Sequence, residues 1–207
     1  RLTARHEQAL WAINGSPSRE NNQGYCRSIK RAYKDKGYDE LRALSGIQRG
    51  YGERYFTLNL QHITNPSESE SERRVEFRIA AGSVNSSKVT AFLRVFTGLV
   101  EAAIEGKGKP SWDIVKPQRD NDLPGGVYAL RRLFATLKWF PHAGLRSQIH
   151  SGDIRPVNSG ATWATSAKGL QCDSPEQAAA AAEASAAILM RLARKYDVAK
   201  GHTFGAR

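Results

Sequence analysis

Cysteine is scarce in this chain of 207 residues: Cys26 and Cys172 are its only two, and no CxxC pair occurs. Two distant cysteines argue against a disulfide-stapled fold or a zinc site and favour a reducing compartment, with one Cys26–Cys172 disulfide as the alternative. No apolar run approaches the about 20 residues of a membrane span, and no signal peptide opens the chain. We therefore expect a cytoplasmic protein with no membrane partner. Arg1 in place of methionine predicts a processed or truncated piece.

Acidic residues are also few relative to basic ones. The chain has 20 Asp and Glu against 31 Lys and Arg, a formal net charge of +11. Such an excess favours anionic partners, whether nucleotide phosphates, nucleic acid or an acidic substrate. A basic cluster interleaved with tyrosines supports nucleic acid, although a solvated face is the simpler interpretation. Its members are Lys30, Arg31, Lys34 and Lys36.

Two segments alternate apolar and polar residues, as half-buried strands do. They span 55–61 and 73–80, with a polar loop between them, and consecutive strands favour an antiparallel pair. The apolar face comprises Phe56, Leu58, Leu60, Val75, Phe77 and Ile79. The opposite face carries Asn59, Glu76 and Arg78.

The clearest helix is expected at 87–105, capped by Asn85 or Ser86. Its apolar stripe should cover the apolar sheet face and leave the polar face open as an active-site floor. That stripe comprises Val89, Phe92, Leu93, Phe96, Val100, Ala103 and Ile104. Further helices are expected at 1–14, at 127–140 and from the Ser174 cap to about 196. The alanine-rich start of the last helix suggests a loosely docked appendage.

The predicted fold class is α+β, an antiparallel sheet backed by helices with a C-terminal helical extension. The predicted divisions are a catalytic domain at 1–145, an irregular linker at 146–173 and the helical extension at 174–207.

Several short motifs occur in an order that resembles the amidoligase family, a branch of the carboxylate–amine ligases that include glutamine synthetase and glutamate–cysteine ligase. The motifs are His6-Glu7-x-Ala9-Leu10, Ser18-Arg19-x-Asn21-x-x-Gly24-Tyr25-Cys26, Arg54-Tyr55-x-x-Leu58-Asn59-Leu60 and Val75-Glu76-Phe77-Arg78-x-x-x-Gly82, followed by the long apolar helix. The resemblance covers about residues 1–105, with the later chain outside it.

The resemblance implies formation of an amide or peptide bond from an acid and an amine, each a small molecule or a peptide, with ATP and Mg²⁺. ATP would phosphorylate the carboxylate, and the amine would displace the phosphate. Glu76 would be catalytic and hold the metal, and Arg78 would contact the phosphates. Asn59 would bind nucleotide or substrate, and Arg19 and Arg54 would hold the acid. The alternative interpretation is structural: Arg19 as a solvated loop arginine, Glu76 and Arg78 in a cross-strand ion pair with neighbours, and Asn59 as a surface residue.

The family's opening strands, G-x-E-x-E and His-x-His, do not occur in this chain. The chain therefore corresponds to the C-terminal half of the family fold. Three interpretations stay open: a piece of a longer enzyme, an enzyme whose missing strands come from a partner polypeptide, and a degenerate ligase fold that serves as a structural or interaction subunit. A basic nucleic-acid-binding module is the alternative from outside the ligase class.

Overall fold

The structure, a computed structural model, describes residues 2–20, 26–29, 55–64, 67, 69–105, 125–137 and 173–202. Its elements in chain order are α1 (Leu2–Arg5), α2 (Glu7–Ala12), η1 (Pro17–Arg19), β1 (Leu58–Asn59), α5 (Gln61–Thr64), η3 (Glu70–Glu72), β2 (Glu76–Phe77), α6 (Ser86–Ile104), α7 (Gly125–Leu137) and α10 (Pro175–Ala199). Within these residues the chain is mostly helical with a small two-stranded antiparallel sheet, which is a mixed α+β fold.

Some predicted features lie outside the described residues. They are Arg54, residues 146–172 of the predicted linker and the cluster of Lys30, Arg31, Lys34 and Lys36. In the described ranges, no helix combines the length and the apolar character that crossing a membrane requires.

The long helices begin at the caps that the sequence predicts. At the start of α6, Asn85 Oδ1 accepts a hydrogen bond from the Lys88 N–H at 2.9 Å. At the start of α10, Ser174 Oγ accepts one from the Gln177 N–H at 3.2 Å. Each cap satisfies a backbone donor that the first turn of a helix leaves unpaired. The observed starts therefore agree with the predicted ones to within a residue or two.

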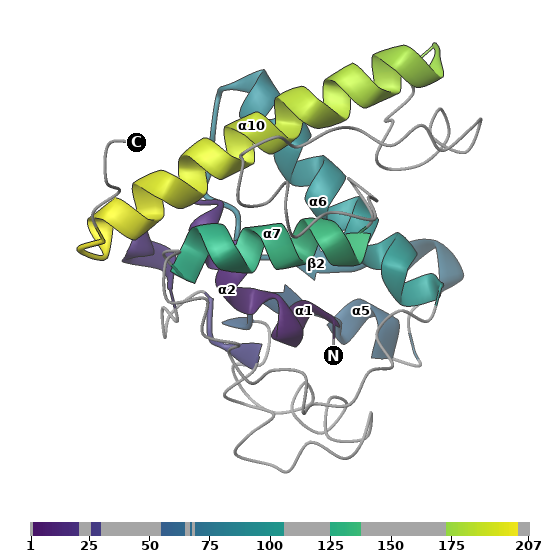
Figure 1. Ribbon diagram of the computed structural model, residues 1–207. Helices are drawn as coiled ribbons and strands as arrows, with labels where there is room; N and C mark the ends of the chain where they lie inside the picture. Colours follow the sequence, from purple (N-terminus) through teal and green to yellow (C-terminus); the bar gives the residue numbers. More distant parts are fainter. Residues whose placement is uncertain are drawn as a thin grey trace.

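The helix α10 is the element against which the other long helices pack. It runs diagonally above α7 in Figure 1 and contacts α2, α6 and α7. The prediction of a loosely docked appendage is wrong, because the small side chains of Ala178 and Ala182 are fully buried and larger ones join the main core. These are Leu189, Met190 and Tyr196, together with Ala186 and Ala193.

A buried carboxylate joins the start of α7 to the end of α10. Asp197, 1% exposed, accepts hydrogen bonds from the Gly126 N–H at 2.7 Å and the Val127 N–H at 2.8 Å. The unpaired N–H groups of a helix start carry partial positive charge, so a carboxylate stabilises them. The approach is close: a Cβ on Gly126 would lie 2.7 Å from Asp197 Oδ1 and 2.8 Å from Tyr196 Cδ1. Glycine is needed here for space.

The predicted hairpin is correct in its pairing but too long. In the antiparallel pair, Leu58 lies opposite Phe77 and Asn59 opposite Glu76, and each strand has two residues. The backbone just before β1 bonds elsewhere, because the Arg27 N–H donates to the Tyr55 carbonyl at 2.7 Å and the Thr57 N–H donates to the Arg27 carbonyl at 3.0 Å. Residues 55–57 thus pair partly with a segment that the periodicity does not reveal.

The helix α6 covers one side of this sheet. The rings of Phe77 and Phe96 stack with their centroids 4.6 Å apart. The predicted apolar stripe of α6 is correct at Phe92 and Phe96, but it is wrong at four exposed positions, which are Val89, Leu93, Ala103 and Ile104. The face that is buried in the core instead includes Ala91, Val95, Gly98, Leu99 and Ala102. This face contains the small residues Ala91, Gly98 and Ala102. It is buried because α6 packs against α10.

The polar face of the hairpin is less open than predicted. Thr57 is fully buried and Asn59 is 3% exposed, whereas Leu58 and Leu60 are half-buried. The expectation of Asn59 on an open sheet face is therefore wrong. On this face the Glu76 side chain is 44% exposed and the Arg78 side chain is 23% exposed.

Replacing Gly126 with alanine should destabilise the protein. Gly126 lies in the first turn of α7, where alanine gains less over glycine than the about 1 kcal/mol of a helix interior. The clash with Asp197 and Tyr196 should therefore give a net loss of about 1–2 kcal/mol. The matched control is Gly82→Ala, because a Cβ there meets nothing within 4 Å. Urea denaturation of both variants measures the difference, and a Gly126→Ala protein more stable than wild type would contradict the close packing.

Candidate functional site

The hairpin brings three predicted site residues together at one carboxylate. Asn59 Nδ2 donates to Glu76 Oε2 at 2.9 Å, and Arg78 Nη1 donates to Glu76 Oε1 at 3.0 Å. Asn59 reaches Glu76 because the two are cross-strand partners. Arg78 reaches it because side chains two residues apart on an extended segment share a face. Both carboxylate oxygens are thus hydrogen-bonded within the protein.

Arg78 has a further donor whose bonding is incomplete. Its guanidinium carbon lies 5.6 Å from the centroid of the Tyr55 ring, within the range of a cation–π contact. Its Nε is buried and makes no hydrogen bond. A buried guanidinium N–H without an acceptor costs free energy, which an anionic oxygen would recover. The site therefore contains a carboxylate beside an arginine that can donate a further hydrogen bond to an anion.

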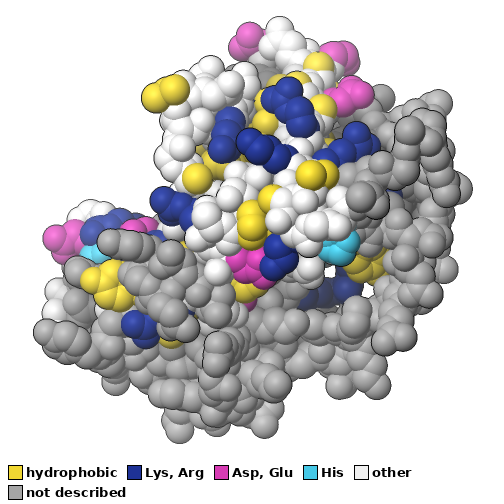
Figure 2. Space-filling view, turned by 90° about the vertical axis from the view of Figure 1, so that its left-hand side faces the viewer, with side chains coloured by type: hydrophobic (Ala, Val, Ile, Leu, Met, Phe, Trp, Pro, Cys, Tyr) yellow, Lys and Arg dark blue, Asp and Glu magenta, His cyan; other side chains and the backbone are white. Residues whose placement is uncertain are grey.

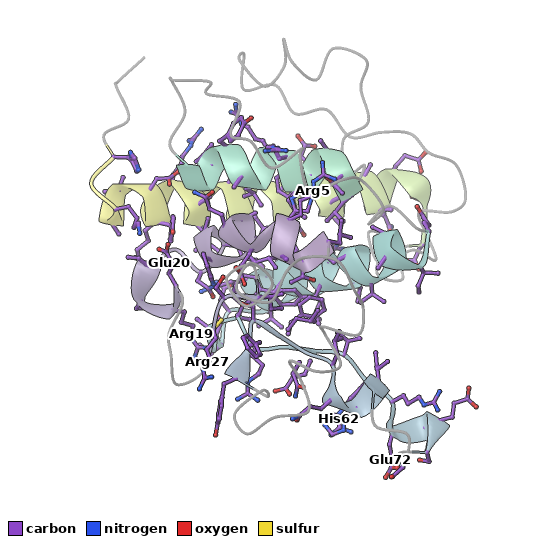
Figure 3. The ribbon with its side chains drawn as sticks, turned by 90° about the horizontal axis from the view of Figure 1, so that it is seen from below. Arg5, Arg19, Glu20, Arg27, His62 and Glu72 are labelled. Carbon is purple, nitrogen blue, oxygen red and sulfur yellow. The ribbon has the colours of Figure 1, made fainter. Side chains whose placement is uncertain are left out.

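Arg19 supports the segment that carries Arg78. Its Nη1 donates to the backbone carbonyl of Ala80 at 3.1 Å and to that of Arg78 at 3.4 Å. The interpretation of Arg19 as a solvated loop arginine is wrong, since the residue is half-buried and bonded to this segment. Figure 3 shows Arg19 next to Arg27 on the side of the helices where the strands lie. Its predicted contact with an acid substrate stays a prediction.

Asn14 holds the same segment one residue further along. Its Oδ1 accepts a hydrogen bond from the Ala81 N–H at 2.7 Å, while its Nδ2 donates to the Leu10 carbonyl at 3.1 Å. The turn that follows α2 is therefore hydrogen-bonded to the chain that follows β2. Together with Arg19, this contact fixes the backbone from Arg78 to Ala81 against the helical core.

A buried glutamate on α2 is the main feature that the sequence reasoning did not identify. Glu7 is 2% exposed. Its Oε1 accepts from the Ile29 N–H at 2.7 Å and lies 2.7 Å from Thr57 Oγ1, and its Oε2 accepts from Ser28 Oγ at 2.5 Å. An acid on the buried side of an otherwise apolar helix was the available signal, because buried carboxylates need several donors. Glu7 places Thr57, and hence β1, against the helices.

Metal-binding and nucleophilic side chains are sparse in the described part of the chain. No group of three His, Cys, Asp or Glu side chains there could hold a metal ion. Cys26 is a buried free thiol, and burial is the main cause that raises its pKa. A neutral, buried thiol is a poor nucleophile, so Cys26 serves packing.

His6, between α1 and α2, is buried as the neutral imidazole. It is 4% exposed, and its Nε2 makes no hydrogen bond. Burial first, and then the positive charges of Arg5 and Arg132, lower the pKa of His6 from 6.5 to about 3. The unfolded chain takes up a proton near pH 6.5, whereas the folded chain does so only near pH 3. Stability is therefore complete above pH 6.5 and falls as the pH drops through this window.

We expect the free energy of unfolding to fall by about 2 kcal/mol between pH 8 and pH 5 through His6 alone. His6→Leu should remove this loss at little cost at pH 8, because the imidazole nitrogen Nε2 has no partner to lose. The exposed His202 supplies the control variant, His202→Gln, which should keep the loss. Urea denaturation at several pH values measures it; equal slopes for the wild-type and His6→Leu proteins would contradict the assignment.

No family model, curated protein or solved structure matches this chain. The site is accordingly defined by its own contacts, and the likeness to the amidoligase family stays a prediction from the ordered motifs.

Proposed function

We propose that this chain forms the phosphate- and metal-facing part of an ATP-dependent carboxylate–amine ligase. The observation that carries the proposal is the meeting of Asn59, Glu76 and Arg78 at one carboxylate. The resemblance to the amidoligase family selects these three residues from two separate motifs, and Asn59 and Glu76 stand 17 residues apart in the chain. Contact between them supports a shared site more strongly than either motif does alone.

The residues fit the phosphate groups of ATP. Arg78 is only partly exposed, and its buried Nε lacks an acceptor. Guanidinium groups bind phosphate oxygens through several N–H donors at once. Arg78 would therefore contact a phosphate and neutralise charge that develops on the transferring phosphoryl group.

The residues fit Mg²⁺ only together with a nucleotide. Glu76 is the carboxylate that would hold the ion, and its side chain is 44% exposed. Mg²⁺ sites in proteins commonly use one or two carboxylates, with phosphate oxygens and water as the other ligands. One carboxylate is thus sufficient when the phosphates are present. By itself it makes a weak site.

ATP, when bound, would supply the phosphoryl group that makes the acid electrophilic towards an amine. Within this proposal, Asn59 orients the Glu76 carboxylate, and Arg19 positions Arg78 through the backbone. The finer architecture also belongs to the proposal: an antiparallel sheet backed by helices, extended by α10, with its first strands supplied by preceding chain or a partner polypeptide.

Glu76→Gln should weaken the binding of MgATP about tenfold or more, because the neutral amide is a poor magnesium ligand and charged contacts of this kind contribute about 1.5–3 kcal/mol. Binding of ATP in EDTA should change little. Arg78→Gln should weaken both. Isothermal titration calorimetry on the full chain measures these constants, with the exposed neighbour variant Glu70→Gln as the matched control.

Two results would overturn the proposal for this chain. One is the absence of measurable MgATP binding by a folded wild-type protein, which would favour a degenerate subunit. The other is equal binding by the Glu76→Gln and Glu70→Gln proteins. Circular dichroism establishes that each variant is folded, so that lost binding is not mistaken for unfolding.

A further inference from the structure

A second feature lies on the outer face of α10, in its C-terminal half. Arg191, Arg194 and Lys195 are exposed and follow the i, i+3, i+4 spacing that places side chains together on a helix. Figure 2 views the molecule from the side where α10 ends and shows a group of Lys and Arg side chains, with Asp and Glu side chains lying above and below it.

The positive charge continues from α10 onto α7. Arg131 of α7 lies close enough to Arg194 that this positive charge, after burial, lowers the pKa of Arg131. Its neighbour Arg132 acts in the same way on Arg5 of α1, which Figure 3 shows beside α7. Arg131, Arg191, Arg194 and Lys195 are called the basic face below.

In the described residues, no acidic side chain pairs with Arg191, Arg194 or Lys195. The one acid in this half of α10 is Asp197, which is buried and bonded to the start of α7. Like charges one helical turn apart repel each other and reduce helix stability by a few tenths of a kcal/mol per pair. Neighbouring cations without acids between them are therefore available to an external anion.

We propose that the basic face binds the phosphate backbone of a nucleic acid. A protein partner would be expected to find apolar or aromatic anchors at the centre of its interface. Val198, 58% exposed, is the large apolar side chain exposed on this half of α10, and no exposed aromatic accompanies it in the described residues. Phosphate contacts need no such anchor, because release of counterions supplies the affinity. This inference is independent of the proposed ligase site.

The test uses the full chain and a short fluorescein-labelled DNA duplex of mixed sequence, with binding followed by fluorescence anisotropy over a range of salt concentrations. The wild-type protein should bind with an affinity that falls steeply with salt. The triple variant Arg191→Gln, Arg194→Gln, Lys195→Gln should bind about tenfold or more weakly. Its log–log salt slope should be smaller by about 2–3, since each lost phosphate contact removes about 0.9.

A charge-matched variant distinguishes a defined face from the general charge of +11. Arg73→Gln, Arg74→Gln, Lys88→Gln removes the same charge from the loop before β2 and from α6, and it should keep most of the affinity and slope. Equal losses in the two triple variants would overturn the proposal, as would absence of binding by the wild-type protein. Competition by polyglutamate as strong as that by unlabelled duplex would also overturn it, in favour of an acidic protein partner.

Discussion

The arrangement of the described residues around the site depends on burial of the Glu7 carboxylate. A buried carboxylate is tolerated only where several donors surround it. Glu7 lies on α2, and its donors come from Ser28, Ile29 and Thr57. Satisfying Glu7 thus requires three distant parts of the chain to meet. Thr57 directly precedes β1, so the position of Asn59, and through it of Glu76, follows from this buried acid.

A second set of polar contacts completes the support of the hairpin. Asn14, which follows α2, and Arg19, in η1, bind the backbone from Arg78 to Ala81. The stacking of Phe77 on Phe96 attaches the same strand to α6. Two-residue strands contribute few ladder hydrogen bonds and are not stable alone. Side-chain contacts to the helices, rather than the ladder, hold the site in place.

Local chemistry accounts for what the sequence could predict. The caps at Asn85 and Ser174 and the antiparallel pairing of two consecutive strands follow from local rules, and these features are observed. The register that sets Asn59 opposite Glu76 was not predicted. The inward face of α6 and the packing of α10 depend on which helices meet, and a single helix pattern contains no such information. The role of Arg19 was missed for the same reason, because its acceptors are backbone carbonyls about 60 residues away.

Three acidic side chains of this protein accept hydrogen bonds from other parts of the fold. Glu7 and Asp197 are buried and receive backbone N–H groups, and Glu20 accepts from Tyr196 and Lys200 at the end of α10. These carboxylates organise helix ends and loops. Because the charges of Glu7 and Asp197 are buried, they do not offset the cations on the outer surface of α10.

The same constraint bears on the proposed ligase site. Each oxygen of Glu76 accepts one hydrogen bond, and the positive charge of Arg78 at Oε1 opposes the binding of a cation there. Arg78 is the more exposed of the two, and its unsatisfied Nε favours a move towards a phosphate. On the proposed function, Arg78 would release Glu76 as it engages the nucleotide. Nucleotide binding would then favour magnesium binding, because the phosphates would draw the positive charge of Arg78 away from Glu76.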